Sequence, residues 1–287
     1  MPQTKTEITA LLDASGLAAN KRLGQHFLID GNLMHRLVDA AEIERDDVVL
    51  EVGPGTGSLT EMLLTRAGHV VAVEVDRGLH DLLTQRLRDA SNLTLLHTDV
   101  LETKSRTTGA VTDAVRDACM SLNARALLVA NLPYHIASPL LVDLVLTDLP
   151  FTSMCFTVQR EVAMRIAAAP RSKDYGPLSI VLQVVGAVRR IAAVPRRAFW
   201  PVPAVESSLL RMDLAPDRRD RLDALRHLNR VVKACFLHRR KTLGHNLRRA
   251  FPDAVDALKA TGQWDLNRRP EDLSTEEWIA FADSLPV

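Results

Sequence analysis

Residues 48–57 read VVLEVGPGTG, an apolar run rich in β-branched side chains that ends in three closely spaced glycines. The run predicts a buried strand over 48–52, and the glycines predict a tight turn where a ligand can approach the backbone. Helical spacing follows over 58–66. A strand, a glycine-rich turn and a helix in this order are typical of nucleotide-binding folds, although many different folds share the arrangement.

The same alternation continues outward from this stretch to about residue 213. Further strands are predicted over 70–75, 93–96, 126–130 and 154–158, with helices over 79–87 and 140–146. Residues 180–188 and 207–212 are candidates for added strands. Because strands that alternate with helices usually form a parallel sheet covered on both faces, we predict an α/β fold with a mostly parallel sheet.

The pattern changes after residue 213. Apolar side chains then recur at helical spacing over 222–236, 243–250 and 278–285. We therefore predict an α/β domain over residues 1–213 and a small all-α domain over 214–287. Within the first domain, residues 102–125 are polar, and their spacing predicts a surface helix to which no chemistry is assigned.

The composition is that of a soluble globular protein, with 287 residues of which 47% are hydrophobic and 25% charged. Cys119, Cys155 and Cys235 are too widely separated for a metal site or a disulfide framework, so we expect reduced and mostly buried thiols and no bound metal. No apolar run has the length of a membrane span, and the first twenty residues lack the features of a secretory signal. We expect a cytoplasmic monomer.

The net charge of +1 is uninformative about partners, but its distribution is uneven. Residues 218–249 contain eleven Lys or Arg against two acidic residues, and an acidic tail follows. A local basic stretch can be the footprint of a nucleic-acid phosphate backbone. From charge alone, a solvated helix face explains the stretch equally well.

Acidic side chains follow the next two predicted strands. Glu74 lies 21 residues after Gly53, where a carboxylate can accept hydrogen bonds from both hydroxyls of a ribose. Asp99 follows the strand over 93–96, where a carboxylate can accept from the amino group of an adenine. Singly, each could be an ordinary acid at a strand end. Together with the E-x-G-x-G-x-G loop, they favour S-adenosylmethionine (SAM) over a dinucleotide.

The most specific short motif is Asn131-Leu132-Pro133-Tyr134, at the end of the strand over 126–130. The N6 lone pair of adenine is delocalised into the ring, so the nitrogen is a poor nucleophile. The Asn131 side-chain oxygen and the Pro133 backbone carbonyl could accept its two hydrogens and restore that lone pair. Tyr134 would stack on a base that has left its own stack. Without the cofactor motifs, a simple strand-to-loop turn would explain these residues equally well.

A second aromatic side chain is needed to sandwich the base. Residues 199–203 read FWPVP and offer one on a loop stiffened by proline. We choose Phe199 for this role and interpret Trp200 as a hydrophobic anchor of the loop.

Taken together, these motifs resemble the KsgA/RsmA family of small-subunit rRNA adenine dimethyltransferases. The similarity covers most of the chain. It runs through residues 21–30, 51–57, 74–77, 99–100, 131–134, 158–163, 175–179, 199–205 and 236–243.

The resemblance implies a seven-stranded, Rossmann-like SAM-dependent methyltransferase domain followed by a small helical domain. It implies N6,N6-dimethylation of two adjacent adenines in a hairpin loop near the 3′ end of the small-subunit (16S) rRNA, with a role in small-subunit biogenesis. The implied cofactor contacts are His26, Leu28, Gly53, Gly55, Glu74, Asp99, Val100 and Asn131. Together with the motif chemistry above, the catalytic residues are expected to be Asn131, Pro133, Tyr134 and Phe199, and Arg239, Arg240 and Lys241 of the basic stretch would bind RNA. Many members of the family have Asn in place of His26, which is a mild departure.

Three other readings compete with this one. Erm-type enzymes, which methylate an adenine of large-subunit rRNA, share the cofactor and Asn-Leu-Pro-Tyr motifs, but residues 175–179 and 236–243 favour the small-subunit enzymes. DNA adenine methyltransferases more often carry a Pro-Pro-Tyr variant. In a mainly non-catalytic assembly factor, the basic stretch would serve RNA binding without methyl transfer.

Overall fold

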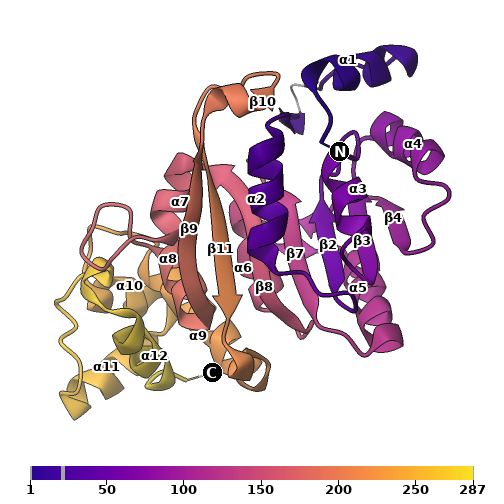
Figure 1. Ribbon diagram of the computed structural model, residues 1–287. Coiled ribbons are helices and arrows are strands. Elements are labelled where there is room, and N and C mark those ends of the chain that lie inside the picture. Colours follow the sequence, from indigo (N-terminus) through magenta and orange to yellow (C-terminus); the bar gives the residue numbers. More distant parts are fainter. Residues whose placement is uncertain (1, 21–22, 287) are drawn as a thin grey trace.

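The computed structural model describes residues 2–20 and 23–286. Lys21 and Arg22, which open the first motif of the family resemblance, lie outside the described residues. A seven-stranded sheet crosses the middle of the molecule in the order β4-β3-β2-β7-β8-β11-β9 (Figure 1). Its parallel strands are β2 (Val48–Val52), β3 (His69–Glu74), β4 (Leu93–His97), β7 (Ala126–Asn131) and β8 (Phe151–Gln159). β11 (Ser207–Leu214) runs antiparallel between β8 and β9 (Gly186–Val194). The predicted α/β fold class is confirmed.

Helices cover both faces of the sheet because side chains along a strand alternate between its faces. Val49 belongs to a hydrophobic cluster with helices α2 (Gly31–Ala41) and α3 (Ser58–Leu64). Val48 and Leu50 belong to a second cluster with α5 (Gly109–Leu122), α6 (Ala137–Val145) and α8 (Pro177–Val185). All five residues of β2 are buried, as expected for a strand covered on both sides.

The strand predicted over 180–188 is wrong, because most of that run is helical. Helix α8 begins with Pro177, whose fixed φ angle suits the first turn of a helix. The apolar run is too uniform for periodicity to separate a helix from a buried strand. Strand β9 begins only at Gly186, where an added Cβ would lie 2.4 Å from the Asp213 carbonyl oxygen of β11. The strands there approach too closely for any side chain.

Several elements that the sequence analysis left out surround the carboxyl edge of the sheet. Helix α1 (Lys5–Ala14) and the strand β1 (Phe27–Leu28) precede α2, and β1 pairs with β10 (Phe199–Trp200). This pairing brings the N-terminal segment beside the loop that leads into β11 (Figure 1). Helix α7 (Arg160–Ile166), which was not predicted, follows β8, and the predicted helix over 79–87 is α4 (Arg77–Arg86), which follows β3.

The polar segment over 102–125 contains the predicted surface helix, α5. A small hairpin of β5 (Leu101–Thr103) and β6 (Arg106–Thr107) precedes it. The buried positions Val111, Val115 and Cys119 lie on one face of α5, with Ala114 and Ala118 packed against the same core, and the opposite face is open to solvent.

Helices α9 (Leu222–Cys235), α10 (Leu243–Ala250), α11 (Pro252–Thr261) and α12 (Thr275–Asp283) gather at one end of the molecule (Figure 1). Short 3-10 turns precede α9 and α12: η3 (Pro216–Arg221) links β11 to α9, and η4 (Pro270–Asp272) lies between α11 and α12. Their buried side chains, including Trp278 and Phe281, belong to the same cluster as β2 and α6. The two predicted domains therefore share one continuous core, and the boundary at residue 213 stays a prediction.

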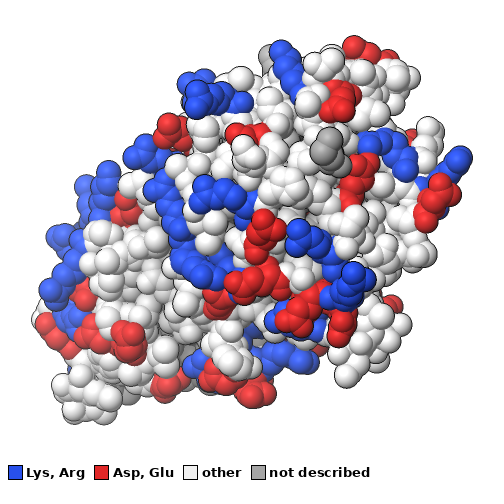
Figure 2. Space-filling view, viewed as in Figure 1, with Lys and Arg blue, Asp and Glu red and all other residues white. Residues whose placement is uncertain are grey.

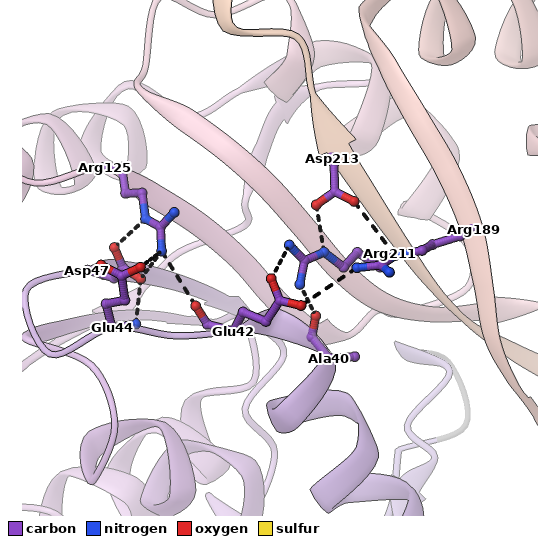
Figure 3. A network of polar contacts seen from close by, with 8 residues as sticks. All are labelled: Ala40, Glu42, Glu44, Asp47, Arg125, Arg189, Arg211 and Asp213. Carbon is purple, nitrogen blue, oxygen red and sulfur yellow. Dashed lines mark hydrogen bonds and ion pairs between the residues drawn. The ribbon is translucent and has the colours of Figure 1, made fainter.

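A network of ion pairs ties the loops at the amino edge of the sheet, opposite the carboxyl edge (Figure 3). Arg125 binds the buried Asp47 carboxylate at 2.7 Å, and this hydrogen bond raises the pKa of Arg125. Arg211 of β11 binds Glu42 at 2.8 Å and Asp213 at 2.6 Å. The network joins the end of α2 to β11.

The three cysteines are free and buried, as predicted. Within residues 2–20 and 23–286, the structure contains no helix that is long and apolar enough to cross a membrane. The same ranges hold no cluster of side chains suited to a metal ion.

Candidate active site

A cavity opens at the carboxyl edge of the parallel strands, where open α/β sheets usually bind their ligands. The loops after β2, β3, β4 and β7 form its walls, and residues 23–28 of the N-terminal segment complete them. Its empty volume, including space open to solvent, is about 1150 Å³. All eight predicted cofactor contacts line this one cavity: His26, Leu28, Gly53, Gly55, Glu74, Asp99, Val100 and Asn131.

The glycines after β2 are required by backbone conformation and by space. Gly53 and Gly55 have φ angles of 72° and 61°, in the left-handed region that favours glycine. A Cβ added to Gly55 would lie 2.9 Å from the Phe27 ring, and one added to Gly53 would lie 3.2 Å from the Pro133 ring. Any other residue here would displace the walls that face the turn.

Two of the predicted acids are held in place by backbone N–H groups. The buried Glu74 carboxylate accepts hydrogen bonds from Gly55 at 3.1 Å and from Asp76 at 2.9 Å. Burial raises the pKa of Glu74, whereas these two hydrogen bonds lower it. Asp99 is exposed and accepts from the Leu101 N–H at 3.0 Å. Since each carboxylate oxygen has two lone pairs, acceptor positions remain for a ligand.

Glu51 is a functional candidate that the sequence analysis quoted only as part of the glycine motif. Its side chain lines the cavity and is 1% exposed, and its Oε2 has no hydrogen-bond partner among the described residues. Burial raises the pKa of Glu51 to about 8. Burial therefore favours the protonated acid, which can donate a hydrogen bond into the cavity.

The N-terminal segment also contacts the glycine loop, which the sequence analysis missed. Gln3 accepts a hydrogen bond from the Thr56 hydroxyl at 2.6 Å and donates to the Thr56 carbonyl at 3.2 Å. The Gln3 N–H donates to the Ser58 hydroxyl at 2.8 Å. Ile8 of α1 is fully buried and lines the cavity. A glutamine near the start of a chain gives no sequence signal of such a role.

Asn131 lies at the end of β7 with both ends of its carboxamide bonded. Its Nδ2 donates to the His26 carbonyl at 2.9 Å. Its Oδ1 accepts a hydrogen bond from the hydroxyl of Thr157, a buried residue of β8. The sequence pattern predicts Asn131 at the site but not the two groups that orient it.

The Pro133 carbonyl and the Tyr134 ring lie beside Asn131. The Pro133 carbonyl accepts from the Ile136 N–H at 3.2 Å, which leaves one lone pair. The Tyr134 hydroxyl is 2.7 Å from the buried Ser207 hydroxyl of β11, and burial raises the pKa of Tyr134. The His26 ring stacks beside Tyr134, with ring centroids 5.8 Å apart. Tyr134 is therefore fixed at its hydroxyl and along its ring.

The prediction that Phe199 forms the second face of a base sandwich is wrong in this structure. Its side chain is 1% exposed and packs in the core cluster with Leu28 and Leu209, and it does not line the cavity. Its strand partner across the β1–β10 pair is Leu28. Trp200 packs against Phe27, with ring centroids 6.2 Å apart, so it anchors the loop as expected.

The basic stretch over 218–249 is partly structural. Arg218 is 1% exposed and donates to three backbone carbonyls at 2.7 Å, so it cannot contact RNA. Arg239 donates to the Ser172 carbonyl at 2.9 Å and lies 4.0 Å from Glu271. Arg240 and Lys241 are exposed, and they line a shallow basic pocket with Arg239, His238 and His245.

The seven-stranded sheet with a glycine-lined cavity at its carboxyl edge defines a Rossmann-like methyltransferase fold. Two solved structures share it. A dimethyladenosine transferase from Plasmodium falciparum has a TM-score of 0.70 at 21% identity and covers 90% of this chain and 98% of its own. The 23S rRNA methyltransferase ErmE has a TM-score of 0.61 at 26% identity, with 90% and 99% covered.

The chain belongs to the ribosomal RNA adenine dimethylase family, whose sequence model matches residues 16–286. Its relatives include the ribosomal RNA small subunit methyltransferase A of Bacillus licheniformis, at 37% identity over 96% of this chain and 94% of the relative. The enzyme of the same name from Lactobacillus delbrueckii is 38% identical, with 96% and 94% covered.

Proposed function

We propose that this chain transfers methyl groups from SAM to the N6 atoms of two adjacent adenines in a hairpin loop near the 3′ end of small-subunit rRNA. The observation that carries the proposal is one cavity in which Asn131 and Tyr134 lie beside Glu74 and Asp99. An adenosine-type cofactor and an adenine base would meet there. The family and the small-subunit names of relatives at 37–38% identity support the choice of substrate.

The residues present fit SAM. Glu74 retains lone pairs for ribose hydroxyls, and Asp99 retains lone pairs for the adenine amino group. Gly53 and Gly55 leave the backbone open to the ligand, and His26, Leu28, Val100 and Asn131 complete the walls. When bound, SAM supplies an electrophilic methyl group.

The catalytic residues would act by holding and orienting the target amine. The Asn131 Oδ1 and the Pro133 carbonyl would accept the two N6 hydrogens, which favours a pyramidal nitrogen with a localised lone pair. Tyr134 would stack on the base and hold it out of its own helix. The proton lost after methylation can pass to water, so the mechanism needs no side-chain base.

The small-subunit substrate is favoured over the large-subunit alternative. The relatives named for the small subunit are 37–38% identical over nearly the whole chain, whereas ErmE is 26% identical. We also propose that the reaction takes place in the cytoplasm, as part of small-subunit biogenesis, which an rRNA substrate supports. A mainly non-catalytic assembly role would not require the oriented carboxamide of Asn131.

The test is methyl transfer from labelled SAM to small-subunit rRNA by the wild type and by Asn131→Ala. We expect the variant to lose about 100-fold or more in kcat, because an oriented polar group beside the reacting atom is removed. Its RNA affinity should stay within about twofold. The exposed Asn267→Ala variant is the matched control and should keep full activity. Unchanged transfer by Asn131→Ala would refute the amine clamp, and no transfer by the wild type would refute the proposed substrate.

A further inference from the structure

We infer that Thr157 is a positioning residue for methyl transfer, which sets the orientation of the Asn131 carboxamide. The inference rests on the proposed function, because it assigns a supporting group to the same amine clamp. Thr157 belongs to β8, outside the motifs that predicted the site. Its side chain is 1% exposed.

The sheet register places the two side chains together. β7 and β8 are parallel neighbours, and Asn131 pairs with Thr157 across them. Paired residues of neighbouring strands extend from the same face of a sheet, so their side chains meet. The meeting point is the carboxyl end of both strands, at the cavity wall.

The direction of each hydrogen bond follows from the chemistry of the groups. The His26 carbonyl can only accept, so the Asn131 atom that faces it at 2.9 Å must be the Nδ2 donor. The Asn131 Oδ1 must then face Thr157, and because this oxygen can only accept, the Thr157 hydroxyl donates. One lone pair of Oδ1 remains for a hydrogen of the target amine.

The His26 carbonyl opposes a half-turn of the carboxamide, and Thr157 holds Oδ1 in place against smaller rotations. If the carboxamide turned by half a turn, its NH2 group would face the target amine, and two donors would meet. The flipped amide would also lose its bond to the His26 carbonyl. Valine has nearly the same shape as threonine but no donor, so Thr157→Val would leave Oδ1 without its partner and let the carboxamide rotate away from the position that the target amine requires.

The experiment measures kcat and KM for methyl transfer to small-subunit rRNA by Thr157→Val, Thr157→Ser and the wild type. We expect Thr157→Val to lower kcat about 10- to 100-fold, as misoriented catalytic groups do, with KM for RNA and Kd for SAM within about twofold. Thr157→Ser keeps the hydroxyl and should recover most of the rate. Ser153→Ala, a buried position four residues earlier on β8, is the control for the integrity of the strand.

A double variant separates positioning from packing. Thr157 should lose its importance once Asn131 is absent, so adding Thr157→Val to Asn131→Ala should cost little more. Wild-type kcat in a folded Thr157→Val variant would overturn the inference. So would equal losses in the Val and Ser variants, or additive losses in the double variant. Those results would leave the proposed function intact, whereas an inactive wild type would defeat the proposed function itself.

Discussion

Glu51 faces the cavity as a buried acid beside a second buried acid, Glu74. Burial raises the pKa of Glu51 to about 8, and the Glu74 charge adds to the increase. In the unfolded chain the pKa of the same group is about 4.5. Between pH 4.5 and 8 the folded state therefore binds more protons than the unfolded state, so the contribution of Glu51 to stability falls as the pH rises through this window.

Glu51→Gln should remove the fall in stability that Glu51 causes between pH 4.5 and 8. At pH 5 the variant and the wild type should unfold at similar urea concentrations, and at pH 8.5 the variant should be more stable by a few kcal/mol, at most about 5. Urea titrations without cofactor at the two pH values make the comparison. Glu102→Gln, on the exposed β5–β6 hairpin, should show no such pH-dependent gain. A variant that is no more stable than the wild type at pH 8.5 would contradict the raised pKa.

The site residues that follow successive strands could be predicted from the sequence. The residues that hold their side chains in place could not. Asn131, Glu74 and Asp99 stand in recognisable positions after strands. Thr157 and Ser207 are hydroxyl residues within strands, a pattern that core positions share. The register of β7 and β8 brings Thr157 to Asn131, and Ser207 reaches the Tyr134 hydroxyl only in the folded chain. Phe199 failed as a prediction for a related reason. Successive side chains of a strand point to opposite sides, and the sequence does not say which side is the core.

Among the elements, α6 ends in an arrangement that no local pattern predicts. The carbonyls of Val145, Thr147 and Leu149 all accept from Arg218 of η3, each at 2.7 Å. These carbonyls lie at and just beyond the C-terminus of the helix, where carbonyls lack helical partners and a cation is favourable. Burial lowers the pKa of Arg218, because the charged guanidinium is removed from water. The hydrogen bonds to the three carbonyls offset part of this cost.

Arg218→Met should destabilise the protein by roughly 3–5 kcal/mol, since it leaves several buried carbonyls without a donor. The neighbouring Arg219→Met is the matched control, because Arg219 is exposed and its loss should cost less than about 0.5 kcal/mol. Urea unfolding of both variants at one pH gives the difference. Equal stabilities would show that water replaces the guanidinium at the end of α6.

Apart from the β5–β6 hairpin, the strands and helices from β2 to β8 were predicted from periodicity, because each alternates with its neighbours. Periodicity failed where an element is apolar on all sides. Apart from Ser179 and Gln183, the residues of α8 are apolar, since the helix packs against α6, α7, α9 and α12. Such a run has the pattern of a buried strand, and only Pro177 at its start indicates a helix.

Over the whole molecule, the near-neutral net charge conceals an uneven surface. Figure 2 shows Lys and Arg along β9 and the neighbouring edge, whereas both signs are mixed on the side of α3 and α4. The structure also sorts the basic residues that the sequence analysis counted together. Some satisfy carbonyls, as Arg218 and Arg226 do, and others are free to meet phosphates. Counting charges along the chain therefore overestimates the cations available to RNA.

Arg240 and Lys241 are exposed residues of the predicted RNA contact, and Arg239 is held by Ser172 and Glu271. Each phosphate contact contributes about −0.7 to −0.9 to the slope of log affinity against log salt concentration. Replacing both residues with Gln should make the slope for small-subunit rRNA shallower by about 1.5, with weaker binding at low salt.

Filter binding between low and moderate salt measures this slope, and the control carries Arg77→Gln and Arg88→Gln. Those two side chains are 85% and 77% exposed, and α4 lies at the opposite end of the molecule from α10 (Figure 1). The control changes the net charge by the same amount, so a general loss of attraction would affect both variants alike. If the loop before α10 contacts the phosphate backbone, the slope changes in the Arg240 and Lys241 variant and stays unchanged in the Arg77 and Arg88 variant. An identical slope in the two double variants would assign Arg240 and Lys241 to a solvated surface.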